Sequence, residues 1–369
     1  MSLRQEVEAI RKSVGNSRRD HLSVVRVSGS GAFALVDATS PAPLFLREGQ
    51  GRHTLLLGED AGPLADLLIL CEEDGFLLIA DGLSEAELGS HLQARRAELP
   101  GVEVDIIGLG ATHVLFGCDG PYAWELVSRI LGPAVLGMPY LTLLACQDEI
   151  LCIRGGRTGE YGYDLLVPRA RAAELAAELA STGQELETRA VSLAALDHCA
   201  LENWHFSPRN LGRRKTQFLP VLTPIELQLQ WRVAYDRRFL GSEALAARRA
   251  ARSGYRVACV STAADIDTNM NMSMNMKEGA PILLHGHPVG QVLTAVQSFF
   301  RQEDVGAALL PDVLAHPGTE GLAVLTADGP VALRTHAPPL LNNRSLFVVP
   351  HRHSYASRRD DQFPPLVTP

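Results

Sequence analysis

Asp66 is the residue of this chain whose type and position most directly suggest chemistry. It lies in AGPLADLLILCEEDG, residues 61–75, where a turn enters an apolar run that is typical of a buried strand. A carboxylate in such a place must be hydrogen-bonded or must face a cleft, because burial of an unpaired charge is costly. Two interpretations therefore stay open for Asp66, a turn cap and a functional-site residue.

A second candidate is the glycine-rich stretch RGGRTGEYGYDLLVP, residues 154–168. No Gly-Lys-Ser/Thr follows the glycines, so it is not a Walker loop. The residues after Gly162 read as a strand and not as the helix that would hold a pyrophosphate. The local pattern predicts a strand, a tight glycine turn and a second strand, and it favours a structural hairpin over a binding loop.

Two histidine pairs, His285/His287 and His351/His353, have the local spacing of metal ligands. Neither pair has a nearby carboxylate or cysteine that would complete a four-ligand set, so we predict no zinc site. Cys118 would need a base beside it to act as a nucleophile, and its apolar neighbours indicate a core position.

The segment TNMNMSMNM, residues 268–276, carries four of the six methionines. A thioether metal site is one interpretation. The segment contains no Cys or His, and its Asn and Ser content favours a mobile loop. We therefore expect no bound metal in this protein.

Composition excludes several classes of partner. The 369 residues have a formal net charge of -8, which provides no basic face for nucleic acid or anionic membrane. No run of 18 apolar residues and no signal-peptide pattern is present. The six cysteines include no Cys-x-x-Cys, which is typical of a reduced, cytoplasmic protein.

The elements that must position these residues are mixed in order. Alternating apolar residues predict strands around 22–28, 63–72 and 75–81, with a hairpin at Asp74-Gly75. A helix should follow Ser84, which is a plausible N-cap with Glu87 three residues later. The strands and helices do not alternate regularly, which favours an α+β fold over a doubly wound one. From about residue 255, short apolar runs separated by Gly and Pro predict an all-β domain.

Seven segments occur in one collinear order between Arg11 and about Leu310. They are IRKSVG, AGPLADLLIL, CDGPYAWELV, RGGRTGEYGYDL, LTPIELQLQW, RRFLGSEAL and HPVGQVLTAV. In this order they resemble the motifs of the glycine-cleavage T-protein (aminomethyltransferase) family of tetrahydrofolate enzymes.

The resemblance implies an α+β, three-domain cloverleaf around a central folate channel, with a C-terminal all-β domain. The expected divisions are a discontinuous folate-binding α+β domain of residues 1–47 and 138–250 and a second α+β domain of residues 48–137. A barrel-like β domain of residues 251–350 and a flexible tail of residues 351–369 follow.

The resemblance also assigns residues. Asp66 matches the second aspartate of the family's pair, the catalytic carboxylate near the reacting folate nitrogens, while Ala65 stands for the first. Asp164 matches the glutamate that pairs with the amino-pyrimidine edge of the pterin. Several positions of the implied channel differ from the family or are matched only by type. They are Arg157 in place of a tyrosine, Leu196 in place of an arginine, His53 and Leu70 at expected tyrosines, Tyr140 as a retained tyrosine, and Arg237 and Arg238 as candidates for the glutamate tail.

These matches imply a tetrahydrofolate-dependent one-carbon transferase, moving a methyl, methylene or aminomethyl unit to or from a small molecule. The replaced channel residues, and a start close to the IRKSVG segment, argue against the standard glycine-cleavage reaction and against a lipoyl carrier protein as partner. Two alternatives stay open. One is an enzyme of the same fold that no longer uses folate conventionally, and the other is a non-catalytic folate-binding scaffold.

Overall fold

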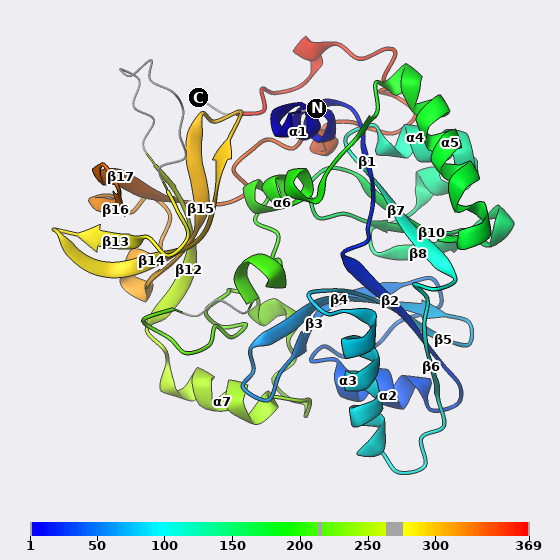
Figure 1. Cartoon of the computed structure of the whole chain (residues 1–369), viewed down its shortest axis with the longest axis horizontal. Coiled ribbons are helices and arrows are strands. Elements are labelled where there is room, and N and C mark those ends of the chain that lie inside the picture. Colours follow the sequence, from blue (N-terminus) through cyan, green and yellow to red (C-terminus); the bar gives the residue numbers. More distant parts are fainter. Residues whose placement is uncertain (1, 213–215, 263–275, 368–369) are drawn as a thin grey trace.

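A computed structural model describes residues 2–212, 216–262 and 276–367. Two open sheets and a closed barrel form three lobes around the middle of the molecule (Figure 1). Helices and strands are mixed and the C-terminal part is all β, so the expected α+β cloverleaf with a C-terminal β domain is confirmed. The Met-rich segment 268–276 lies outside the described residues except for Met276, which is buried.

The first sheet has six strands in the order β11-β1-β7-β10-β9-β8. Apolar residues of α4 (Ala123–Leu131) and α5 (Ala172–Gly183) cover one of its faces. The glycine stretch joins β9 to β10 as an antiparallel hairpin, as the local pattern predicts. The strands are β1 (Gly15–Arg18), β7 (His113–Asp119), β8 (Thr142–Ala145), β9 (Leu151–Gly155), β10 (Gly162–Pro168) and β11 (Arg189–Ala190).

The second sheet has five strands in the order β3-β4-β5-β2-β6. Its outer face packs on α2 (Ala32–Thr39) and α3 (Glu85–Ala97), and α3 begins with the expected Ser84–Glu87 capping box. Its inner face packs against apolar residues of the first sheet. The strands are β2 (Leu22–Ser28), β3 (Gly51–Leu57), β4 (Pro63–Glu72), β5 (Gly75–Asp81) and β6 (Asp105–Gly108).

The barrel closes in the order β12-β15-β14-β13-β16-β17 around its own apolar core. The turn at His285-Gly286 joins β13 to β14, and both residues have positive φ, as a tight hairpin requires. The strands are β12 (Tyr255–Thr262), β13 (Pro281–Leu284), β14 (His287–Ser298), β15 (Glu303–Pro311), β16 (Leu322–Thr326) and β17 (Gly329–His336).

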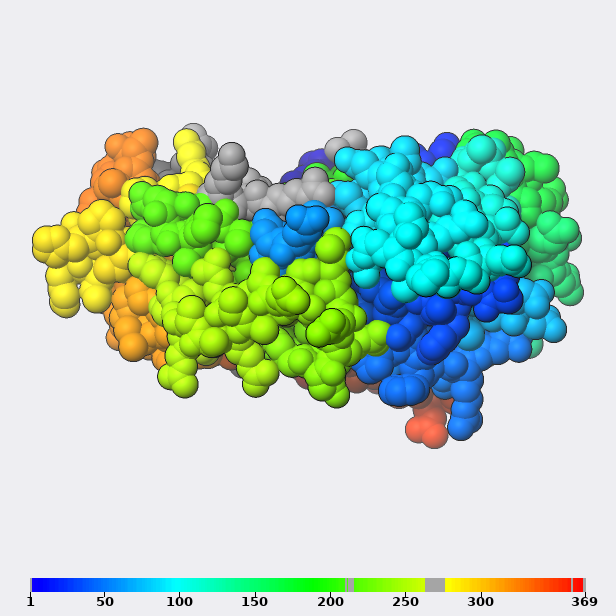
Figure 2. Space-filling model, turned by 90° about the horizontal axis from the view of Figure 1, so that it is seen from below, coloured from blue at the N-terminus to red at the C-terminus, as the bar shows by residue number. Residues whose placement is uncertain are grey.

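The chain between 203 and 251 connects the lobes. Apolar residues of this segment pack between β3 of the second sheet and strands β12, β14 and β15 of the barrel, so the segment lies between the two lobes (Figure 2). At the N-terminal end of the chain, α1 (Leu3–Lys12) packs on α6 (Leu193–Glu202). The remaining helix is α7 (Ser242–Ala251). Short helices are η1 (Pro133–Gly137), η2 (Gln147–Glu149), η3 (Arg169–Arg171), η4 (Gln184–Leu186), η5 (Pro208–Gly212), η6 (Gln230–Arg232), η7 (Asp312–Leu314), η8 (Arg344–Leu346) and η9 (Asp360–Gln362). None of the described helices combines the length and apolar character needed to cross a membrane.

Two expectations differ from the structure. The sheets do not follow boundaries at 47 and 137, because β2 joins the second sheet and β7 joins the first; strand pairing is a tertiary choice that a local pattern does not encode. The tail after Pro350 also packs, since Tyr355 and Phe363 are buried against the core of the first sheet. Its polar composition predicts flexibility, but buried side chains and hydrogen bonds such as that from Tyr355 N to Glu125 hold it against the sheet.

Candidate active site

Asp66 lies within β4, and its side chain is 1% exposed. Arg232 Nη1 donates to Asp66 Oδ1 over 2.5 Å, and His53 Nε2 donates to Oδ2 over 2.9 Å. His53 is on β3, where Leu55 is directly opposite Asp66, so His53 reaches the carboxylate as a diagonal neighbour. The sequence predicts both Asp66 and His53 as site residues, and the structure brings them into contact.

His205 and Arg157 complete the surroundings of Asp66. His205 follows α6, its ring stacks on that of His53 with centroids 5.4 Å apart, and its Nε2 lies 3.5 Å from Asp66 Oδ2. Arg157 is on the glycine turn, and its Nε lies 3.8 Å from the same oxygen. Four side chains that are cationic or able to become so therefore surround one carboxylate.

The charge state of this group follows from burial and from its partners. Burial by itself raises the pKa of Asp66, but His53, Arg232 and the hydrogen bonds from His205 and His53 hold it well below its ordinary value. Burial lowers the pKa of His205 to about 4 and also lowers that of His53. At neutral pH, Asp66 is thus an anion paired with Arg232, between two neutral imidazoles.

His53, Asp66 and His205 have metal-ligand chemistry, with ligand atoms that lie within 4.8 Å of one another. Two guanidinium groups already approach the carboxylate, and a divalent cation there would meet their repulsion. We therefore interpret the group as an ion-pair network. His285 and His287, in a hairpin turn, are both exposed. His353 Nδ1 accepts from the backbone of Val349.

Asp164 lies on β10 and belongs to a neighbouring network. Arg19 Nε donates to Asp164 Oδ1 over 3.1 Å, and the same guanidinium bonds Asp119 on β7. One oxygen of the expected pterin partner is therefore engaged within the protein. Cys118 is fully buried, and burial raises the pKa of its thiol to about 12, so it is no nucleophile.

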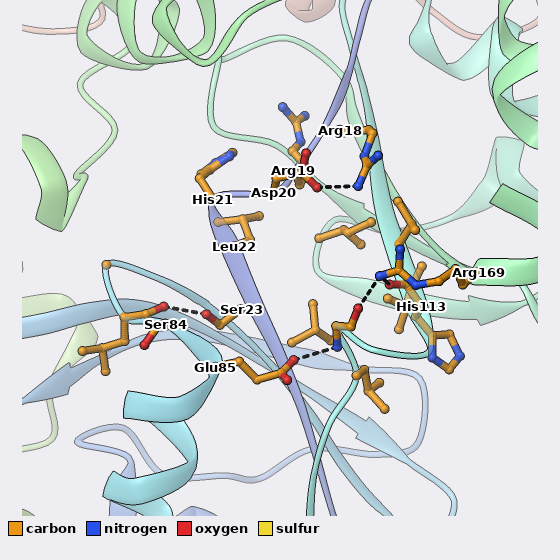
Figure 3. A pocket seen from close by; sticks show the side chains of 18 of the residues that line it. Arg18, Arg19, Asp20, His21, Leu22, Ser23, Ser84, Glu85, His113 and Arg169 are labelled. Carbon is orange, nitrogen blue, oxygen red and sulfur yellow. Dashed lines mark hydrogen bonds and ion pairs between the residues drawn. The ribbon is translucent and has the colours of Figure 1, made fainter. Parts of the chain in front are cut away.

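Three adjacent cavities run past these residues. One of about 350 Å³ is lined by His53, Tyr140, His205, Trp231 and Arg232. A narrow cleft beyond it shares His205 and is lined by Arg157, Asp164 and Leu196 among others. A third, of about 500 Å³, shares Arg19, His21 and Arg209 with that cleft, and Figure 3 shows its wall where β1 leads into β2.

The other predicted residues lie at the rim or outside. Tyr140 is 57% exposed where it lines the first cavity, and Trp231 beside it is 71% exposed. Arg237 bonds Asp37 on α2 and does not line the three cavities, and Arg238 is exposed. Leu70 is buried in the core between the two sheets.

His205, Arg232 and Arg19 are site residues that sequence reasoning misses. Arg232 directly follows the LTPIELQLQW segment, and that position is the one signal that could have found it. His205 stands alone in ENWHFSPRN, with no spacing that marks it. Each of the three meets a carboxylate that lies 100 residues or more away in the chain.

Comparison with known proteins gives a consistent result. The family described as the GCVT N-terminal domain matches residues 1–237. The aminomethyltransferase of Frankia alni is 28% identical over 340 residues, covering 89% of this chain and 86% of that protein. That of Corynebacterium aurimucosum is 26% identical over 316 residues, covering 78% and 80%. The glycine cleavage system aminomethyltransferase T of Bartonella henselae superposes with a TM-score of 0.80 at 22% identity, over 93% of this chain and 90% of that one, and so shares the fold.

Proposed function

This chain belongs to the GCVT N-terminal domain family of glycine-cleavage T-proteins, and on that premise we propose that it transfers a one-carbon unit between tetrahydrofolate and a small substrate. Asp66 is the catalytic carboxylate of this proposal. The observation that carries it is a buried, ionised carboxylate whose partners His53 and Arg232 line one cavity and whose neighbour Arg157 lines the next.

Asp66 acts in this proposal through its charge. Its pKa lies far below neutrality, so it does not carry the proton at pH 7. A fixed anion in a site with little water stabilises positive charge that develops on a nitrogen as carbon is transferred. Arg232 and His53 hold the carboxylate in place, which keeps its orientation constant during the reaction.

In this proposal the residues that line the first cavity and the cleft would hold a long, flat, partly aromatic ligand. Tetrahydrofolate would supply the nitrogen that accepts or donates the one-carbon unit. Tyr140 and Trp231 present aromatic surface at the exposed end of the first cavity. Asp164, deeper in the cleft, would accept hydrogen bonds from the amino-pyrimidine edge, while Arg19 keeps its present bond to Oδ1. His205 lines both the first cavity and the cleft, so its ring would contact a ligand where the two meet.

The nature of the one-carbon donor is a separate proposal. The relatives carry the name aminomethyltransferase, so an aminomethyl donor is the first candidate. Arg157 and Leu196 both line the narrow cleft, where the resemblance leads us to expect a tyrosine and an arginine. The exchange of both within one cleft favours a different small substrate, and we keep this as the second candidate.

Anaerobic calorimetry with tetrahydrofolate and 5-methyltetrahydrofolate tests the cofactor. We expect micromolar binding to the full chain, weakened about tenfold in Asp164→Ala through loss of charge-assisted hydrogen bonding to its free carboxylate oxygen. Asp328→Ala, at the exposed turn between β16 and β17 of the barrel, is the matched control and should bind like the parent protein. No binding to the parent protein overturns the proposal.

Single-turnover assays then separate the two donors. Aminomethyl donors, free and on a lipoyl carrier protein, are compared with small N-methyl amines, and the tetrahydrofolate product is identified by mass. Release of ammonia from the aminomethyl donor with formation of methylenetetrahydrofolate establishes the first candidate. Transfer only from a small amine establishes the second.

A further inference from the structure

Arg157 differs from the other arginines around the cleft in having no committed partner. Arg19 bonds Asp119 and Asp164, and Arg209 bonds Asp81 and Asp197. Arg232 bonds Asp66. Within the described ranges, Arg157 makes no hydrogen bond; its Nε is buried without a partner, and its nearest charge is Asp66 Oδ2 at 3.8 Å.

The backbone holds this guanidinium in place. Gly156 and Gly159 have φ of +123° and +86°, which side-chain-bearing residues rarely adopt. A Cβ at Gly159 would lie 2.2 Å from Asn343 Nδ2, so the turn is closely packed. The carbonyl of Thr158 accepts from the buried Arg11 over 2.7 Å. Arg157 is therefore presented by a rigid turn, and its side chain is still 21% exposed.

Charge around the cleft restricts what Arg157 can bind. Asp81, Asp119, Asp164 and Asp197 outnumber the three arginines that line the cleft, while Asp66 and Arg232 balance each other. The lining thus has one formal negative charge, which disfavours a simple anion and still more a phosphate. A molecule with one carboxylate and one cationic group adds no net charge.

We propose that Arg157 is the carboxylate anchor for a small zwitterionic one-carbon substrate, whose cationic amine lies against the aspartates that line the cleft. The proposal rests on the proposed one-carbon transfer and assigns Arg157 to the substrate rather than to folate. A planar guanidinium binds a carboxylate through two parallel hydrogen bonds. Arg157 supplies the positive charge for the carboxylate, and the four aspartates of the cleft lining, opposed by only two further arginines, supply negative charge for the amine.

The test compares four probes on the full chain by ligand-observed NMR, with and without tetrahydrofolate. N-methylglycine carries both charged groups and a one-carbon unit. N-methylglycinamide lacks the carboxylate, and acetate lacks the amine. Inorganic phosphate carries more negative charge than a carboxylate. We expect N-methylglycine to bind at least about tenfold more tightly than each of the others. The bidentate carboxylate contact accounts for the difference from the amide, and the charge of the amine accounts for the difference from acetate and phosphate.

Variants assign the effect to the residue. Arg157→Gln should weaken N-methylglycine binding about tenfold and leave N-methylglycinamide and tetrahydrofolate unchanged. Arg157→Lys keeps the charge but not the fork and should be intermediate; it also serves if the glutamine variant does not fold. Arg256→Gln, on the barrel, removes the same charge elsewhere and should have no effect.

Each outcome bears on one proposal. Equal binding of N-methylglycine and its amide, retention of N-methylglycine binding by Arg157→Gln, or tightest binding of phosphate overturns the carboxylate anchor. Tetrahydrofolate binding with any of these results leaves the one-carbon function standing. Loss of tetrahydrofolate binding in Arg157→Gln would assign the residue to the cofactor instead.

Discussion

Arg232 Nη1 lies 2.5 Å from Asp66 Oδ1, although 166 residues separate them in the chain. Asp66 belongs to β4 of the five-stranded sheet, and Arg232 ends η6 in the segment that leads toward the barrel. The bond ties the five-stranded sheet to the connecting segment at the candidate active site. It also keeps the carboxylate ionised, which makes Asp66 an electrostatic group and not a proton carrier.

Asp66→Asn should separate binding from turnover. The amide keeps the shape of the side chain but removes the charge, so we expect turnover with the donor identified above to fall about 100- to 1000-fold. Tetrahydrofolate binding should change by less than about threefold, because that ligand also contacts other walls of the channel. Asp105→Asn, at an exposed position of β6 away from the three cavities, is the control for charge. Unchanged turnover would show that Asp66 is not the catalytic carboxylate.

Arg232→Gln should destabilise the fold. It leaves Asp66 buried without its strongest partner, and breaking one side of a buried ion pair costs about 3–5 kcal/mol. Urea unfolding of Arg232→Gln, Asp66→Asn and the double variant measures the coupling. We expect the double variant to lose clearly less than the two single losses added together. Simple additivity would mean that the contact contributes nothing of its own.

Acid should weaken the folded state through His205. Its pKa is about 4 in the fold, against about 6.5 in an unfolded chain. The unfolded state therefore binds more protons between pH 4 and pH 6.5, so stability is full above pH 6.5 and falls as the pH decreases through that window. From pH 7 to pH 5 the share of His205 is on the order of 1–2 kcal/mol.

Denaturant midpoints for the parent protein and His205→Gln, measured from pH 7.5 to 4.5, check this share. Burial also lowers the pKa of His21 to about 4, so the variant keeps part of the slope. Identical slopes for the two proteins would show that His205 titrates normally in the fold.

Removal of metal should have no effect on the protein. In the group formed by His53, Asp66 and His205, the Asp66 carboxylate is already paired with Arg232. We therefore expect dialysis against a chelator to leave tetrahydrofolate binding and thermal stability unchanged. Elemental analysis of the purified protein provides the second measurement. A stoichiometric transition metal that is lost in His53→Gln would establish a metal centre and contradict the ion-pair interpretation.

Tyr355→Ala should destabilise the six-stranded sheet. Tyr355 is 4% exposed, and its ring meets Tyr122 edge-on with centroids 5.2 Å apart. Removing a buried aromatic ring costs about 3 kcal/mol. His351→Ala, exposed in the same tail, should be neutral. Equal thermal unfolding of both variants would restore the expectation of a flexible tail.

Features that depend on neighbours in sequence could be predicted. The hairpin at 154–168, the Ser84 capping box and the change to short strands near residue 255 all follow from contacts over a few residues. The order of the seven motifs along the chain is enough to indicate the family. Asp66 stands out because an acidic residue inside an apolar run must have a partner.

The partners themselves could not be predicted. His205 and Arg232 reach Asp66 only because the segment after α6 folds between two lobes, and Arg19 reaches Asp164 across two strands of one sheet. The sheet that β2 and β7 each join, and the packing of the tail, likewise depend on contacts between distant parts of the chain.

The sequence by itself determined the local elements, the family and the carboxylate at the centre of the candidate site. Tertiary structure alone decided which cations pair with that carboxylate and that Arg19 occupies one oxygen of Asp164. It also decided that the hydrogen-bond donors of Arg157 stay unused among the described residues. The physical reason is range. Turns and caps are determined by hydrogen bonds between residues a few positions apart in the sequence. The charge state of a buried group instead depends on every group that folding brings within a few ångströms of it.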